Sequence, residues 1–160
     1  MPESPGHPGR VIARLARQLE LALATVDLSL PQYRILSFLA SGNEAASALA
    51  EKLAVSRPSV TGVVDGLVSR GLVTRVDDPA DRRRVGHDLT AAGRQLLESA
   101  EAEVERRLNE ILSHRPDQAP AALVGLTPWQ EALDSYRTAR RAARRRAAEQ
   151  ATELVPGAKP

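Results

Sequence analysis

The sequence predicts a mainly α-helical protein that carries one small β-hairpin. Apolar residues recur at helical spacing in several segments, and after Gly71 the period changes from 3.6 to 2 in two short runs at 72–76 and 85–89. The chain holds one Trp, two Tyr and one Phe among 160 residues, so we expect a core of aliphatic side chains. The clearest helical stripe is Val60, Val63, Val64, Leu67 and Val68.

The helices of the first half are predicted from such stripes and from start and stop signals. The first covers about 10–26, and the second begins after Ser29 and runs to Gly42, which suits a left-handed helix end. A small helix at 47–53 and a three-residue turn at 54–56 lead directly into the helix that carries the valine stripe. We expect Ser56 to be its N-cap and Gly71 its stop.

The second half is predicted to contain two long helices joined by a linker. Thr90 caps a helix that runs to about 112, and the Pro- and Ala-rich stretch 114–125 has at most a turn or two of helix. The last helix runs to about 150, with Thr127 as N-cap, Pro128 in first place and Gln130 completing a capping box. We expect residues 1–9 and 151–160 to be disordered tails.

Composition excludes several classes of function. The chain has no cysteine, which excludes disulfides, thiolate metal sites and thiol switches. His7, His87 and His114 are scattered without the spacing of metal ligands, so we predict no metal site and no cofactor. No Ser-His-Asp or paired-carboxylate grouping points to an enzyme. No stretch approaches the roughly 20 apolar residues of a membrane span, and the N-terminus does not resemble a signal peptide, so we expect a cytoplasmic protein without a membrane partner.

The charge is segregated along the chain. All but two of the 22 cationic residues are arginine, whose planar guanidinium suits phosphate and narrow grooves. They cluster at 82–84, at the tip of the predicted hairpin, and at 137–146 in the last helix, whereas 98–110 carries five acidic residues against two arginines. The cluster at 137–146 has three open interpretations: a solvated helix, a contact with flanking DNA phosphates, or a contact with the acidic helix.

The order helix, three-residue turn, helix and hairpin is that of a winged helix-turn-helix, which lays its second helix in the major groove of DNA. The outward first turns of that helix hold a guanidinium, a hydroxyl and a glycine that allows close approach, and the hairpin tip, or wing, suits the minor groove. The candidate DNA-binding residues are Ser56, Arg57, Pro58, Ser59, Thr61 and Gly62 in the helix, and Arg82, Arg83 and Arg84 in the wing.

Three stretches resemble the multiple-antibiotic-resistance regulator (MarR) family. They are 49–61 (LAEKLAVSRPSVT), 67–75 (LVSRGLVTR), and 78–84 (DPADRRR) followed by 89–93 (LTAAG). The resemblance covers about 10–111, with a looser match at 126–128. It implies a fold with a winged helix-turn-helix at 29–96, flanked by N- and C-terminal dimerisation helices at 10–28 and 97–150.

The resemblance also implies a function and residue roles. A homodimer would bind a pseudo-palindromic operator on double-stranded DNA as a transcriptional regulator, most often a repressor. Arg83 would enter the minor groove with Asp81 orienting it, and Arg82 and Arg84 would meet phosphate or solvent. Arg75 would contact phosphate, for which an exposed strand residue without a role is the alternative. A small phenolic or carboxylate effector would bind near Tyr33 and Arg34, for which plain core packing of Tyr33 is the alternative.

One function of another class remains open from the residues alone. A winged helix can also serve as a protein-interaction module without specific DNA binding, with the basic C-terminal helix docking on an acidic partner. Single-stranded nucleic acid is disfavoured because no aromatic residue lies between Phe38 and Trp129 to stack on bases.

Overall fold

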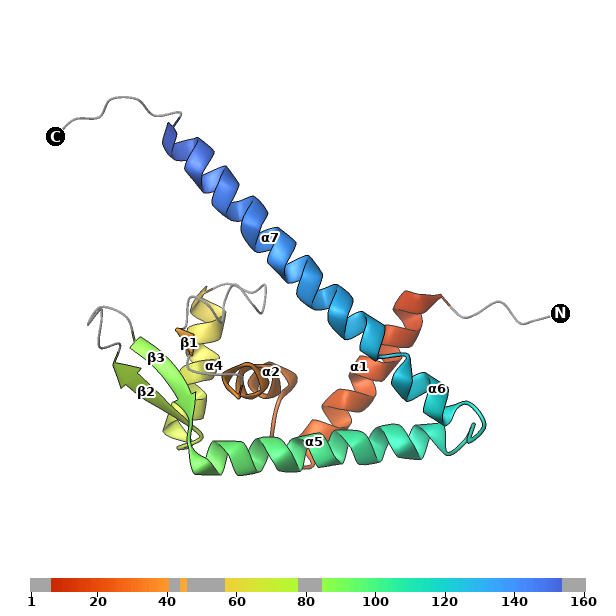
Figure 1. The fold of residues 1–160 in the computed structure, drawn as a ribbon. Helices are drawn as coiled ribbons and strands as arrows, with labels where there is room; N and C mark the ends of the chain where they lie inside the picture. Colours follow the sequence, from red (N-terminus) through yellow and green to blue (C-terminus); the bar gives the residue numbers. More distant parts are fainter. Residues whose placement is uncertain (1–6, 41–43, 46–56, 78–84, 154–160) are drawn as a thin grey trace. The chain divides into compact units, whose positions relative to one another are not determined.

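The structure, a computed structural model, describes residues 7–40, 44–45, 57–77 and 85–153 (Figure 1). It divides into two units, residues 1–111 and residues 112–160, which are described separately. The predicted mainly α-helical fold with a small antiparallel sheet is confirmed. The elements in chain order are α1 (Pro8–Ala24), α2 (Leu30–Leu39), β1 (Glu44–Ala45), α4 (Arg57–Ser69), β2 (Val73–Asp77), β3 (Val85–Leu89), α5 (Ala91–Leu112), α6 (Ala119–Val124) and α7 (Thr127–Glu153).

The sheet has three strands in the order β1-β3-β2, all antiparallel. The predicted hairpin is β2 and β3, which pair from Val73 with Leu89 to Asp77 with Val85. Strand β1, in which Glu44 pairs with His87, was not predicted. Two residues are too few to show the alternation of polar and apolar side chains that marks a strand in a sequence.

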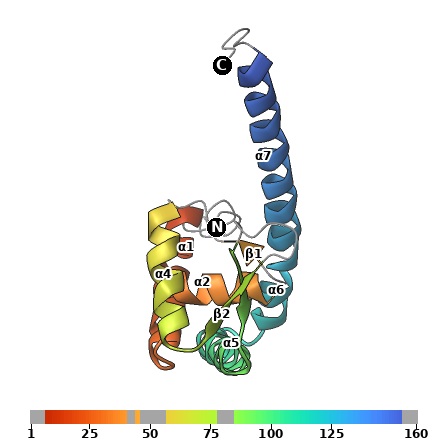
Figure 2. The ribbon, with the colours of Figure 1, turned by 90° about the vertical axis from the view of Figure 1, so that its left-hand side faces the viewer.

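The core of the first unit surrounds α2, which contacts α1, α4 and β3 (Figures 1 and 2). It is aliphatic, as predicted, and the valine stripe of α4 faces it: Val60, Val64 and Leu67 are at most 2% exposed. Val63 and Val68 are partly buried at its margin. The remaining buried apolar residues of this core are Leu23, Leu28, Ile35, Leu36, Leu39, Leu72, Val73, Leu89, Leu97 and Ala100.

Helices α1 and α4 end in the same way. The Leu28 N–H donates to the Leu23 carbonyl, and the Leu72 N–H donates to the Leu67 carbonyl, which closes a Schellman motif at each end. The motif requires one residue with positive φ, which is Asp27 at 54° in α1 and Gly71 at 68° after α4. The predicted stop at Gly71 is therefore confirmed. At the end of α1 the same position holds an aspartate, which adopts positive φ at a higher free energy than glycine does.

The start of α5 packs tightly on the end of α4. Thr90 is the predicted cap: its hydroxyl accepts from the Gly93 N–H at 3.0 Å, and it donates to the Gly71 carbonyl at 2.8 Å. A Cβ on Gly93 would overlap the Leu72 carbonyl oxygen. Glycine is therefore required at this corner by close approach of two backbones.

Several predicted helix boundaries differ from the structure. Helix α1 begins at Pro8, where His7 caps it, and α7 reaches Glu153, so parts of both expected disordered tails are helical. Helix α2 ends at Leu39, before the predicted stop at Gly42. Residues 1–6, 154–160, Gly42, and the helix and turn predicted at 47–56 lie outside the described residues.

The second unit contains α6 and α7. The six-residue α6 agrees with the turn or two of helix expected in the linker. Helix α7 starts at Thr127 itself, because the Leu126 carbonyl accepts from the Trp129 and Gln130 N–H groups, so Thr127 is not its N-cap. Its 27 residues make a rod of about 40 Å. Among the described residues, no helix has the length and apolar character needed to cross a membrane.

Candidate DNA-binding surface

Helix α4 has one buried face and one exposed face. The buried stripe holds the helix on the core, while Thr61, Gly62 and Asp65 are exposed on the other side. A Cβ on Gly62 would meet no atom within 4 Å, so packing within the protein does not require glycine there. The exposed face is therefore small and polar near the N-terminal end of the helix, where the helix dipole favours an anion.

An ion pair joins the exposed face of α4 to the hairpin. Arg75 Nη2 of β2 lies 2.6 Å from Asp65 Oδ1 of α4. Both side chains are about half exposed, so the pair contributes at most about 1 kcal/mol to stability. Its geometric effect matters more, because it holds the predicted phosphate contact, Arg75, beside the helix. No local pattern in the sequence indicates this pair, since the two residues belong to different predicted elements.

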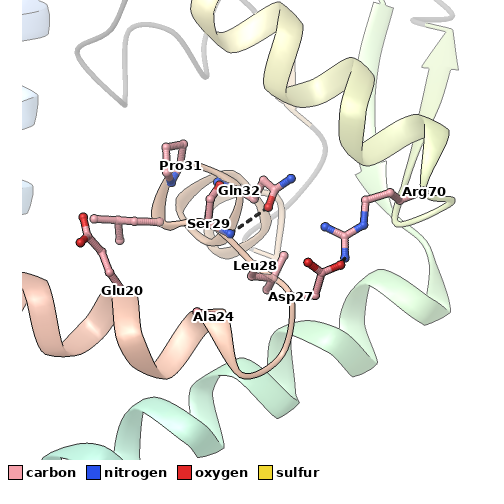
Figure 3. Close-up of a pocket in the computed structure, with 9 residues that line it drawn as sticks. Glu20, Ala24, Asp27, Leu28, Ser29, Pro31, Gln32 and Arg70 are labelled. Atoms are coloured by element: carbon pink, nitrogen blue, oxygen red, sulfur yellow. Dashed lines mark hydrogen bonds and ion pairs between the residues drawn. The ribbon is translucent and has the colours of Figure 1, made fainter.

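A second ion pair ties the other end of α4 to the end of α1. Arg70 Nη2 lies 3.1 Å from Asp27 Oδ2, so the residue with positive φ after α1 faces the last residue before Gly71 (Figure 3). These residues are 43 positions apart, so no local pattern in the sequence indicates that they meet. The Arg70 guanidinium therefore joins the C-terminal end of α4 to the C-terminal end of α1.

The Asp27–Arg70 pair lines a hollow of about 520 Å³ within the first unit. The start of α2 forms its wall, where Ser29 and Gln32 make a reciprocal capping box (Figure 3). The spacing Ser-x-x-Gln at 29–32 is the sequence signal for this box. The other lining residues are Glu20, Ala24, Leu28, Leu30 and Pro31.

The residues predicted to meet an effector do not line this hollow. Tyr33 is half-buried and packs against the hydrophobic core, while Arg34 of the same helix is exposed. The packing of Tyr33 is the alternative that the sequence left open. An effector near these two residues stays a prediction.

Not all of the predicted DNA-binding residues fall within the described part of the chain. Thr61, Gly62 and Arg75 share one region, since Arg75 pairs with Asp65 one helical turn beyond Thr61. Arg57, Pro58 and Ser59 form the first turn of α4. Ser56, Asp81, Arg82, Arg83 and Arg84 lie outside the described residues.

Comparison with known proteins decides the family. A model described as "MarR family" matches residues 26–84. The regulator FarR of Neisseria gonorrhoeae, described as an HTH-type transcriptional regulator, is 35% identical over 98 residues, which cover 61% of this chain and 67% of FarR. The chain belongs to the MarR family. YfiV of Bacillus subtilis, another HTH-type regulator, is 33% identical over 115 residues, covering 69% of this chain and 70% of YfiV.

Solved structures of MarR-family proteins share the fold. Wild-type MarR from E. coli matches with a TM-score of 0.66 at 24% identity, covering 78% of this chain and 97% of MarR. CouR from Rhodococcus jostii, solved with p-coumaroyl-CoA bound, matches with a TM-score of 0.64 at 26% identity, covering 81% and 87%. This member of the MarR family is a DNA-binding transcriptional regulator and not an enzyme.

Proposed function

We propose that the protein is a homodimeric repressor that blocks transcription by occupying a pseudo-palindromic operator. The observation that carries this proposal is the exposed face of α4 at Thr61 and Gly62, backed by a buried stripe, in a chain of a DNA-binding family. Each protomer inserts one α4 into a major groove, and the two half-sites lie about one helical turn, roughly 34 Å, apart.

In this proposal the residues of α4 and those of the wing contact different parts of the DNA. The residues Ser56, Arg57, Pro58 and Ser59, together with Thr61 and Gly62, supply hydroxyl and guanidinium donors and a close approach of the backbone in the major groove. Arg83 enters the minor groove with Asp81 as its orienting carboxylate. Arg75, Arg82 and Arg84 neutralise phosphates.

Exposed apolar side chains support the dimer. Val11, Ile12 and Leu15 of α1 are 41–61% exposed, and Trp129 and Leu133 of α7 are 66% and 51% exposed. Exposed apolar side chains concentrated on two helices are typical of a protein–protein interface. In a symmetric dimer a second copy would cover them with the same apolar side chains. In this proposal 10–28 and 97–150 serve dimerisation, and 29–96 binds DNA.

A mobility-shift experiment tests the proposal with two matched glycine variants. Gly62→Ala should leave α4 as stable or slightly more stable, because nothing lies within 4 Å of the new methyl group. It should nevertheless weaken operator binding by about tenfold, since the methyl group holds the helix away from the groove wall. Gly66→Ala, one turn further along and with equally open space, is the control and should bind normally.

The wing is tested in the same experiment. Arg83→Ala should cost roughly 1–3 kcal/mol of operator affinity, and binding of the unchanged protein should fall steeply with salt. Equal affinity for a selected palindromic fragment and for random competitor would contradict operator recognition. Absence of binding to any duplex at low salt would favour the interaction-module alternative.

We also propose a small aromatic or carboxylate effector. Support comes from CouR, which was solved with an aromatic acyl-CoA bound, and from Tyr33 and Arg34 on α2, a phenol and a guanidinium on one helix. A panel of aromatic acids tested for release of the operator checks this proposal. If one releases it, Arg34→Ala should abolish the response without changing DNA binding, and an unchanged response would exclude Arg34.

A further inference from the structure

The second half of α7 carries arginines where an amphipathic helix would carry its apolar stripe. Positions 137, 140, 141, 144 and 145 fall at i, i+3, i+4, i+7 and i+8, so they share one face of the helix. No Asp or Glu occurs from Ser135 to Ala148. We call the five positions the arginine face.

The arginine face continues the apolar stripe of the first half of the helix. Trp129, Leu133 and Tyr136 occupy the same side of α7 by their spacing. The contact that joins the two parts is Arg140, whose guanidinium carbon lies 5.8 Å from the centre of the Tyr136 ring. One continuous face of α7 is therefore apolar in the first half of the helix and basic in the second half.

The arginines of α7 whose side chains the structure describes have fewer carboxylate partners than those of α5. On α5, Arg106 lies 2.8 Å from Glu103 and 3.6 Å from Glu110, and Arg107 lies 3.6 Å from Glu110. The hydrogen bond from Arg106 to Glu103 raises the pKa of that arginine above its ordinary value. Among the described side chains of α7, only Arg137 has a carboxylate partner, Asp134 at 3.3 Å.

The described arginines beyond Arg137 are exposed and face solvent. Arg145 and Arg140 are exposed, and Arg146, on the opposite side of the helix, donates to its own backbone at the Ala142 carbonyl. Like charges three and four residues apart destabilise a helix, so the arginine face carries a cost within the free protein. An external polyanion would remove that cost.

We propose that the arginine face of α7 binds the phosphate backbone of double-stranded DNA, as a second contact in addition to α4 and the wing. Guanidinium groups bind phosphate oxygens in a bidentate manner, and duplex DNA offers closely spaced phosphates along its length. Between Arg137 and Arg145 the remaining residues are Thr138 and three alanines, so no long side chain flanks the face there and holds a duplex away. The contact is independent of base sequence and adds affinity for operator and random DNA alike.

An acidic protein surface is the competing partner, and the structure favours it less. An acidic surface that a second copy would offer is the segment 98–110 of α5, in which Glu103 and Glu110 are already paired with arginines of their own helix. DNA is a polyanion that a protein of this family already binds.

The test compares two double variants of the full-length protein with equal charge. Arg140→Gln with Arg145→Gln removes two members of the arginine face. Arg115→Gln with Arg146→Gln removes two exposed arginines of the same unit that lie off that face. Glutamine and arginine have similar helix propensity, and circular dichroism confirms that the helix is retained.

The measurement is affinity against salt concentration for a random duplex of about 40 base pairs and for the selected operator. For the arginine-face variant we expect the slope of log affinity against log salt to shrink by about 2 for each protomer bound, and affinity at about 0.1 M salt to fall about tenfold or more, on both duplexes. The operator-to-random ratio should not change. The control variant should keep the slope of the original protein.

Equal slopes for the two variants would overturn the proposal. A change in the dimer–monomer equilibrium without a change in slope would also overturn it, and would assign the arginine face to a protein contact. The outcome is separable from operator recognition, because Gly62→Ala tests the operator-to-random ratio while the arginine face alters the slope on any duplex.

Discussion

The two units contain long helices that bury their apolar side chains very differently. In the first unit the stripe of α5 is buried at Leu97 and Ala100, whereas Trp129 and Leu133 of α7 are more than half exposed. Ion pairs differ as well: Asp27–Arg70 and Asp65–Arg75 join separate elements, while the pair on α7 joins residues three apart. The stripe of α5 is therefore covered within the first unit, whereas Trp129 and Leu133 are not covered within the second unit.

The largest expected effect is at the corner between α4 and α5. Gly93→Ala places a methyl group against the Leu72 carbonyl oxygen, so we expect it to destabilise the first unit by about 3 kcal/mol. Denaturant unfolding measures this loss. A substitution of equal size in the second unit, Gly125→Ala, is the control: its methyl group would lie 3.1 Å from the Ala121 carbonyl oxygen, a tight contact but not an overlap. Equal losses of unfolding free energy for the two variants would contradict the tighter backbone packing that we assign to Gly93.

The next largest expected effect is on the association constant of the proposed dimer. Trp129→Ala with Leu133→Ala should weaken the dimer by about 2 kcal/mol or more, because apolar side chains of this kind dominate helix interfaces. The unfolding free energy of the first unit, measured at a concentration where both proteins are monomeric, should not change. Sedimentation equilibrium measures the dimer constant. A dimer constant equal to that of the original protein would show that α7 is not part of the interface.

The smallest effects are those of the exposed ion pairs. Asp65→Asn should lower the stability of the first unit by less than about 1 kcal/mol, since both partners are about half exposed. Asp134→Asn, which removes the local pair of α7, should leave that stability unchanged. Thermal unfolding at low and high salt checks both, because screening by salt should abolish the difference. A loss that persists at high salt would indicate that Asp65 acts by packing and not by charge.

The sequence by itself determined the elements whose signals are local. The valine stripe predicted the buried face of α4, Gly71 predicted its end, and Thr90 predicted the start of α5, because side-chain period, positive φ and capping depend on neighbouring residues. The order of the predicted elements indicated the winged helix-turn-helix, and the stretches 49–61, 67–75, 78–84 and 89–93 carried the resemblance to the family.

Only the tertiary structure decided what depends on residues far apart in the chain. The two ion pairs of α4, the short strand β1 and the need for glycine at position 93 each arise where separate segments meet. The spacing of residues in the sequence does not predict these contacts, since each partner taken alone looks like an ordinary surface or loop residue. Helical spacing puts five arginines of α7 on one face, but only the structure shows that the arginines described beyond Arg137 are exposed and without a carboxylate partner.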